Sequence, residues 1–156
     1  MNRSSRYFIA IAIFAFAAVG VALVLQTQFD MQPCAWCVMQ RLIYLSVGAF
    51  ALLALVTPQR IRRLPGAFAV FLSITGIGIA LYQQFVAAQS ESCGLSFAER
   101  FMSATGLDSA LPTLFGATAS CSEANVPLLG VPFAWWSVAL FALLAVLGAL
   151  ALASRR

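Results

Sequence analysis

The sequence contains no histidine and no lysine, and charged residues make up only 9% of its 156 residues. Without histidine, the chain lacks the commonest general base of enzymes and a ligand found in most zinc sites. Only five residues are acidic, so the formal net charge is +4. All nine basic residues are arginines, and most of them lie beside apolar segments. Membrane topology explains that placement better than nucleic-acid binding does, and we expect no nucleic-acid partner.

Apolar residues are abundant instead: they make up 62% of the chain, against about 45–50% in a soluble domain. Four segments are long enough to cross a hydrocarbon core of about 30 Å and carry almost no charge: residues 7–25, 38–56, 67–86 and 133–153. The bilayer offers the backbone no hydrogen-bond partners, so these segments must be helices. The sequence therefore predicts an all-α membrane protein, a four-transmembrane-helix bundle forming a single integral membrane domain over residues 1–156.

The first apolar segment has some features of a secretory signal. Arg3 and Arg6 precede it, and Ala15-Phe16-Ala17 resembles a cleavage site. The apolar run continues through residues 21–25, however, so an uncleaved membrane anchor is favoured.

Charge asymmetry predicts how the bundle is oriented. Seven arginines lie before the first span, between the second and third, and after the fourth: Arg3, Arg6, Arg60, Arg62, Arg63, Arg155 and Arg156. An even number of spans brings these regions to one side, which the positive-inside rule makes cytoplasmic together with both termini. All acidic residues and all four cysteines fall in the other two connections, residues 26–37 and 87–130. These connections are expected to face an outer, disulfide-permissive compartment.

The second outer connection, residues 87–130, is long for a loop, and loops of this length are usually functional or disordered. Part of it has a helical pattern, with apolar side chains on one face and polar ones on the other. The apolar face consists of Leu95, Phe97, Ala98, Phe101 and Met102. This pattern predicts either a short amphipathic helix on the membrane surface or a loop that packs its apolar residues over the helix ends.

Two of the cysteines form a C-x-x-C motif, Cys34-Ala35-Trp36-Cys37, where a polar stretch enters the second apolar segment. Pro33 is typical of a position at or just before the first turn of a helix, so both sulfurs are expected on one face of that turn. Unpaired amide groups and the positive end of the helix dipole stabilise a thiolate there. Arg41 follows Cys37 by four residues, on the same face, and adds a full positive charge.

Each of these residues also has a simpler explanation. Arg41 either extends its guanidinium to the lipid headgroups or holds a negative charge or polar ligand beside Cys37. A quinone would be such a ligand, because quinones are electron acceptors soluble in the bilayer and their oxygens become anionic on reduction.

The four cysteines form either two stabilising bridges or a redox pathway. A zinc site is disfavoured because Cys93 and Cys121 lack the spacing of a second C-x-x-C, so we expect no metal.

The residues Gln32-Pro33-Cys34-Ala35-Trp36-Cys37-Val38-Met39-Gln40-Arg41 resemble the P-C-x-x-C-x-x-x-R start of the second helix in the DsbB family of bacterial disulfide-forming membrane proteins. Four spans, inside termini and a long second outer loop with two cysteines are similar as well. Near the end, the resemblance extends to Cys121-Ser122-Glu123, Leu129-Gly130 and Trp135-Trp136. It covers nearly the whole chain and implies a quinone-dependent enzyme of the inner membrane, with cysteines facing the periplasm.

The resemblance also implies a route for the electrons. Cys93 is expected to form a mixed disulfide with a DsbA-like periplasmic thioredoxin-fold partner, and Cys121 is its disulfide mate. Cys34 exchanges with that pair. Cys37 contacts the quinone, ubiquinone or menaquinone, with the help of Arg41.

Two positions depart from the pattern of some relatives. Gln84, near the outer end of the third span, stands where some relatives carry a histidine near the quinone, which makes it a candidate quinone-binding residue. A tryptophan expected in some relatives between Cys121 and Leu129 is absent.

Other functions fit parts of the sequence. Proteins like vitamin K epoxide reductase are also small helical bundles with a C-x-x-C, but their motif usually lies in a later helix. A non-enzymatic, disulfide-bridged scaffold or a small transporter belongs to a different class. Transport is disfavoured because the chain lacks a buried acid and a pair of helices broken near the midplane. The oxidation state of the cysteines distinguishes a scaffold from an enzyme, since a scaffold's cysteines stay oxidised whereas an enzyme's cysteines cycle with the quinone supply.

Overall fold

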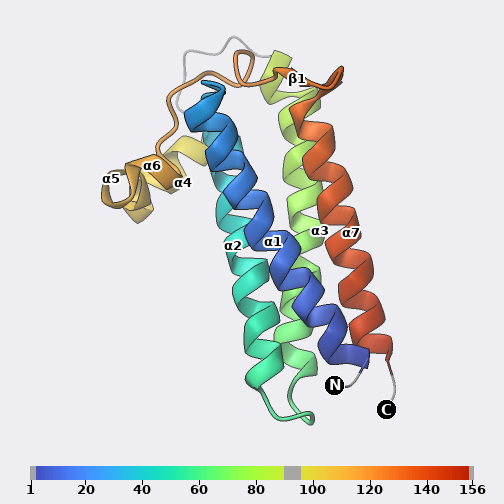
Figure 1. Ribbon diagram of the computed structural model, residues 1–156. Helices are drawn as coiled ribbons and strands as arrows, with labels where there is room; N and C mark the ends of the chain where they lie inside the picture. Colours follow the sequence, from blue (N-terminus) through green and yellow to red (C-terminus); the bar gives the residue numbers. More distant parts are fainter. Residues whose placement is uncertain (1–2, 90–95, 155–156) are drawn as a thin grey trace.

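The computed structural model describes residues 3–89 and 96–154 of the chain. Four long helices lie side by side (Figure 1): α1 (Arg3–Gln28), α2 (Ala35–Val56), α3 (Arg63–Phe85) and α7 (Phe133–Ala153). Each is long and apolar enough to cross a membrane, so the four predicted spans are confirmed. Helices α1, α2 and α3 begin three or four residues before the apolar segments. Hydropathy detects only the part of a helix that lies in the hydrocarbon core, and polar residues at the membrane surface can extend the helix beyond that part.

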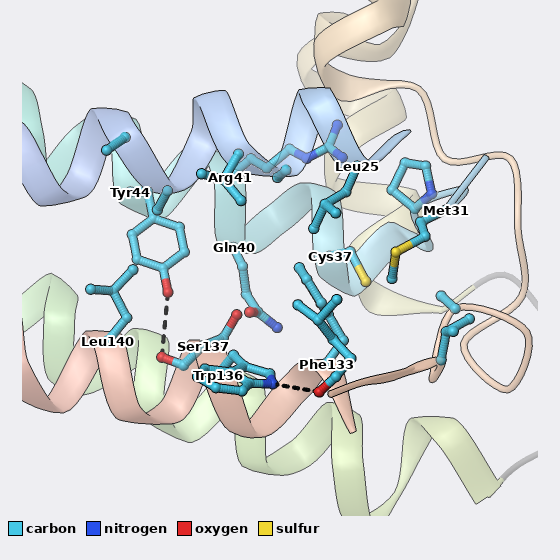
Figure 2. A pocket seen from close by; sticks show the side chains of 18 of the residues that line it. Leu25, Met31, Cys37, Gln40, Arg41, Tyr44, Phe133, Trp136, Ser137 and Leu140 are labelled. Carbon is cyan, nitrogen blue, oxygen red and sulfur yellow. Dashed lines mark hydrogen bonds between the residues drawn. The ribbon is translucent and has the colours of Figure 1, made fainter. Parts of the chain in front are cut away.

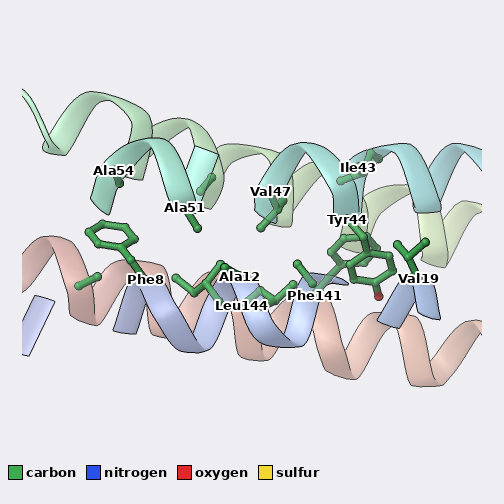
Figure 3. Packing of buried hydrophobic residues seen from close by; sticks show 14 residues of the cluster. Phe8, Ala12, Val19, Ile43, Tyr44, Val47, Ala51, Ala54, Phe141 and Leu144 are labelled. Atoms are coloured by element: carbon green, nitrogen blue, oxygen red, sulfur yellow. The ribbon is translucent and has the colours of Figure 1, made fainter. Parts of the chain in front are cut away.

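Each long helix packs against two others: α1 and α3 both contact α2 and α7. The core between them is made of buried apolar side chains (Figure 3), among them Phe8, Ile11, Val47, Phe141 and Leu144. Small residues let the helices approach closely. Gly76 of α3 lies against the ring of Phe141, where an added Cβ would come within 2.5 Å of the ring. The rotation of α3 about its axis is therefore constrained by this contact.

The two ends of the bundle carry different structures (Figure 1). One end holds the start of α1, the end of α7 and the connection between α2 and α3. The other end holds the short elements between α3 and α7: η1 (Ala87–Gln89), α4 (Phe97–Thr105), α5 (Leu107–Ala110), α6 (Pro112–Phe115), β1 (Pro127–Leu128) and β2 (Val131–Pro132). Cys34 and Cys121 also lie at this second end. Cys93 lies outside the described residues.

The helical pattern in the long connection forms α4, which begins with a capping box at Ser96 and ends at Gly106 with a positive φ of 68°. Its apolar residues divide between two environments. Ala98 and Met102 are buried in clusters with side chains of α2. Phe97 is 68% exposed and belongs to the side of α4 turned away from the bundle. The segment is thus a short amphipathic helix that packs part of its apolar face on α2, whereas its position on a membrane surface stays a prediction; Leu95 lies outside the described residues.

A two-residue hairpin turn between β1 and β2 leads into α7. Leu129 and Gly130 both have positive φ angles, 55° and 82°, as a type I′ turn requires. The indole N–H of Trp136 donates to the carbonyl of Leu128 over 3.2 Å, which fastens the hairpin to the first turn of α7. The hairpin thus covers the end of the bundle where the cysteines lie.

Candidate redox site

Cys34 and Cys37 lie together at the start of α2. Cys34 is the N-cap residue, with extended backbone angles, and its carbonyl accepts from the amide of Val38 over 3.0 Å. Its side chain is 1% exposed. The two Sγ atoms are 3.1 Å apart, so a disulfide between them requires an approach of about 1 Å. The structure therefore places both sulfurs on one face at the start of α2, as predicted.

Cys121 reaches the same place from the long connection. Two backbone amides, those of Thr118 and Ala119, donate to the carbonyl of Pro33 over 3.0 and 3.2 Å. The hydroxyl of Thr118 also donates to the side chain of Gln32 over 2.8 Å. These bonds tie the connection to the residues just before Cys34. As a result, the sulfur of Cys121 lies beside that of Cys34, close enough for the two thiols to shift each other's pKa.

The contacts around Cys34 distribute the protons unevenly. The hydrogen bond from Cys34 lowers the pKa of the Cys121 thiol. The same bond, the contact with Cys37 and burial raise the pKa of the Cys34 thiol. These directions favour a thiolate on Cys121 over one on Cys34. A thiolate in contact with the sulfur of a second cysteine is the arrangement from which thiol–disulfide exchange proceeds.

Cys37 is held by a chain of two buried glutamines that the sequence did not single out. Gln83 of α3 is 2% exposed, and its Nε2 donates to the Cys37 sulfur over 3.1 Å. Gln40 of α2 is 5% exposed, and its Nε2 donates to the Oε1 of Gln83 over 2.5 Å. Because Gln40 fixes the acceptor end of the Gln83 amide, the donor end points at the sulfur. Two polar side chains inside apolar spans were the signal available in the sequence.

Arg41 is buried rather than extended to the headgroups, with 5% of its surface exposed. Its Nη1 donates to the Oε1 of Gln26 in α1 over 2.8 Å and to the carbonyl of Leu114 in α6 over 3.1 Å. Both acceptors are neutral oxygens, so these contacts position the guanidinium without neutralising it. The charge remains available to a negative group beside Cys37.

Cys37, Gln40 and Arg41 line a cavity of about 320 Å³ between α1, α2 and α7 (Figure 2). Its other walls are mostly apolar and include Phe14, Ala22, Leu25, Phe133 and Leu140. The volume lies within the range of small-molecule sites, which are largely apolar with a few placed polar groups. Gln84 is not among the residues that line it, and the Oε1 of Gln84 is buried without a hydrogen-bond partner in the described part of the chain.

No group of three or more potential metal ligands occurs among residues 3–89 and 96–154. The described site is thus one of three thiols, two amides and a guanidinium beside an apolar cavity. Such a site can exchange disulfides at one side and present a thiolate to a neutral, apolar molecule at the other.

Comparisons with known proteins agree over nearly the whole chain. The sequence model of a family described as "Disulfide bond formation protein DsbB" matches residues 4–151. A protein named Disulfide bond formation protein B from Cupriavidus necator is 38% identical over 140 residues, covering 88% of this chain and 86% of its own. One of the same name from Ralstonia nicotianae is 33% identical, with 94% and 92% covered. Disulfide bond formation protein B 1 from Pseudomonas syringae pv. syringae is 30% identical, with 94% and 88% covered.

Proposed function

This chain belongs to the DsbB family of disulfide bond formation proteins, and on that basis we propose that it reoxidises a DsbA-like periplasmic dithiol protein and passes the electrons to membrane quinone. The family makes it a multi-pass membrane oxidoreductase that generates disulfides. The single observation that carries the finer proposal is the position of Cys34, whose sulfur contacts both Cys37 and Cys121.

The exchange steps follow from that position. A thiolate of the reduced partner attacks Cys93 of a Cys93–Cys121 disulfide, and Cys121 leaves as a thiolate. Cys121 then attacks the sulfur of Cys34 in a Cys34–Cys37 disulfide, and Cys37 leaves as a thiolate. The second thiol of the partner displaces Cys93, so the partner leaves oxidised. Cys93 finally attacks Cys121 and releases Cys34, which restores the Cys93–Cys121 disulfide. Each step breaks one sulfur–sulfur bond and forms another, and the two electrons of the partner end on Cys34 and Cys37, from which quinone takes them as the Cys34–Cys37 disulfide forms again.

The cavity beside Cys37 fits a quinone head. Its apolar walls suit a molecule dissolved in lipid, and Arg41 supplies the cation that oxygens of a reduced quinone require. Quinone accepts two electrons and two protons when it becomes quinol. Gln83 and Gln40 hold the Cys37 sulfur, while Gln26 and Leu114 hold Arg41, so the thiolate and the cation have fixed positions at one cavity. Gln84 has no such contact and does not line the cavity; the amide that contacts Cys37 is that of Gln83.

The proposed orientation places the thiols in the periplasm of a bacterial inner membrane. The charge distribution supports it, since seven arginines fall in the three sequence segments assigned to the cytoplasm and all five acids lie in the two connections that carry the cysteines. The described arginines of that set, Arg3, Arg6, Arg60, Arg62 and Arg63, belong to the end of the bundle opposite Cys34. That side is where a soluble, disulfide-forming partner works.

The experiment that tests this function mixes the purified protein with a reduced DsbA-like dithiol protein and a soluble quinone, and follows quinone absorbance. We expect stoichiometric loss of quinone and of partner thiols, both abolished in Cys34→Ala. A non-enzymatic scaffold leaves both unchanged. If a small dithiol is oxidised at the same rate as the partner protein, an enzyme of the vitamin K epoxide reductase type is favoured instead.

A further inference from the structure

A second cavity, of about 490 Å³, lies at the opposite end of the bundle from the thiols. The start of α1, the connection between α2 and α3, the start of α3 and the end of α7 all contribute to it. Three arginines line it, Arg60, Arg62 and Arg63. The positive-inside rule accounts for the side on which these arginines lie, but not for their placement around one cavity.

The described lining of the cavity holds no anion for these charges. None of the residues that line the cavity is acidic. Within the described chain, the guanidinium of Arg62 bonds to two neutral oxygens: Nη1 donates to the hydroxyl of Ser5 over 3.1 Å, and Nη2 donates to the carbonyl of Leu55 over 3.3 Å. Its Nε is buried with no hydrogen-bond partner in the described chain. Arg60 and Arg63 are exposed, so an anion from outside the chain can reach the charges that line the cavity.

The surroundings of the cavity indicate the chemistry of that anion. Guanidinium groups bind phosphate oxygens in pairs, with planar geometry and full charge. Gln59 and Ser154 add polar groups, whereas Phe8, Ala151 and Leu152 form an apolar part of the same lining. A cavity that is basic on one side and apolar on the other, at the ends of membrane-spanning helices, matches a phosphate group with acyl chains attached.

We infer that this cavity binds the phosphate headgroup of an anionic phospholipid of the surrounding membrane. Basic pockets between transmembrane helices are a known form of lipid site. The bound phosphate bridges Arg60 and Arg63, while Arg62 connects the start of α1 to the end of α2 through Ser5 and Leu55. The lipid therefore joins the connection between α2 and α3 to the start of α3. This site is independent of the redox chemistry proposed above.

The test compares lipid binding by the intact protein in phosphatidylcholine nanodiscs with and without phosphatidylglycerol, using native mass spectrometry and thermal unfolding. The variant is Arg60→Gln with Arg63→Gln; Arg62 stays because it bonds to other helices. Arg100→Gln, an exposed arginine in α4 at the other end, is the matched control. We expect retained phosphatidylglycerol and a higher unfolding temperature in the wild type and in the control.

Each arginine beside an anionic surface strengthens binding about five-fold, so the preference of the double variant for phosphatidylglycerol is expected to fall about twenty-five-fold. Equal retention of both lipids by the wild type, or an unchanged preference in the double variant, overturns the inference. A third arm adds inorganic phosphate to protein in neutral detergent. If phosphate alone stabilises the wild type as much as phosphatidylglycerol does, the site takes free phosphate and the lipid assignment is wrong.

Discussion

The amide of Gln83 donates a hydrogen bond to the sulfur of Cys37 across 3.1 Å, from one membrane-spanning helix to another. Both groups are inside the bundle, where a hydrogen bond to a charged sulfur has little competition from water. A glutamine is neutral, so it stabilises a thiolate without closing an ion pair that would resist electron transfer. Arg41 supplies the full positive charge at the cavity. Stabilising the Cys37 sulfur and providing a cation for the acceptor are therefore done by different residues.

Replacing Gln83 with leucine removes the donor while keeping a side chain of similar size. Hydrogen bonds to charged groups contribute about 1.5–3 kcal/mol, so we expect quinone-dependent reoxidation of Cys34–Cys37 to slow about ten-fold or more. The measurement is the single-turnover rate at saturating quinone. Gln84→Leu is the matched control and is expected to keep the wild-type rate. An equal loss in both variants contradicts a specific contact with Cys37.

The cavity makes a separate prediction about quinone affinity. Ala22 of α1 lines the cavity, whereas Val24, two residues on, does not line it and is 52% exposed. Ala22→Phe fills part of the space and is expected to raise KM for quinone several-fold, with partner oxidation at saturating quinone less affected. Val24→Phe adds bulk to the same helix and is expected to leave KM unchanged. Equal KM values in the two variants exclude this cavity as the acceptor site.

The contact between Cys34 and Cys121 predicts which disulfide forms when Cys37 is removed. In Cys37→Ala, Cys34 has no partner in its own motif and Cys121 is the sulfur beside it. We expect peptide mapping of the oxidised variant to find a Cys34–Cys121 disulfide as the main product. A Cys34–Cys93 linkage in its place means that the described position of Cys121 is not the one used in exchange.

The hydrogen bond from Cys34 also predicts a pH dependence. It lowers the pKa of Cys121, so the thiolate is present at lower pH than for an ordinary thiol, whose pKa is about 8.5. In reduced Cys37→Ser/Cys93→Ser protein, alkylation of Cys121 by iodoacetamide is therefore expected to begin at lower pH than that of a model thiol. Adding Cys34→Ala removes the donor and shifts the profile to higher pH. Mass spectrometry assigns the modified residue, and a profile that does not move refutes the contact.

Hydropathy was sufficient for the long helices but not for the contacts between them. The fourth span, residues 133–153, has the same bounds in the structure because Pro132 precedes it and Ser154 ends the apolar run. By contrast, hydropathy does not distinguish Gln83 from Gln84, which are adjacent and point about 100° apart on a helix. The packing of Gly76 against Phe141 sets the rotation of α3, and that contact depends on a distant helix.

The path of the long connection, residues 87–130, also could not be predicted from the sequence. Cys121 lies beside Cys34 because the amides of Thr118 and Ala119 donate to the carbonyl of Pro33. These are bonds between backbone groups, which every residue type has, so the amino-acid sequence does not indicate them. The sequence pattern predicted which residues carry the chemistry, namely the cysteines and Arg41, and that assignment stays a prediction. It did not identify the residues that hold them, which are Gln26, Gln40 and Gln83.

Arg41 provides the most demanding prediction, because it is buried, charged and positioned by two neutral acceptors. Its charge matters most when negative charge develops on the acceptor, so Arg41→Gln is expected to slow quinone-dependent reoxidation of Cys34–Cys37 and to weaken quinone binding. Lysine is expected to restore part of the rate, since a point charge cannot reproduce the planar guanidinium fork. Exchange between Cys121 and Cys34 does not use this cation and should proceed at the wild-type rate, which separates a local effect from misfolding. A wild-type reoxidation rate with unchanged quinone affinity in Arg41→Gln would mean that the guanidinium serves only to join α1, α2 and α6.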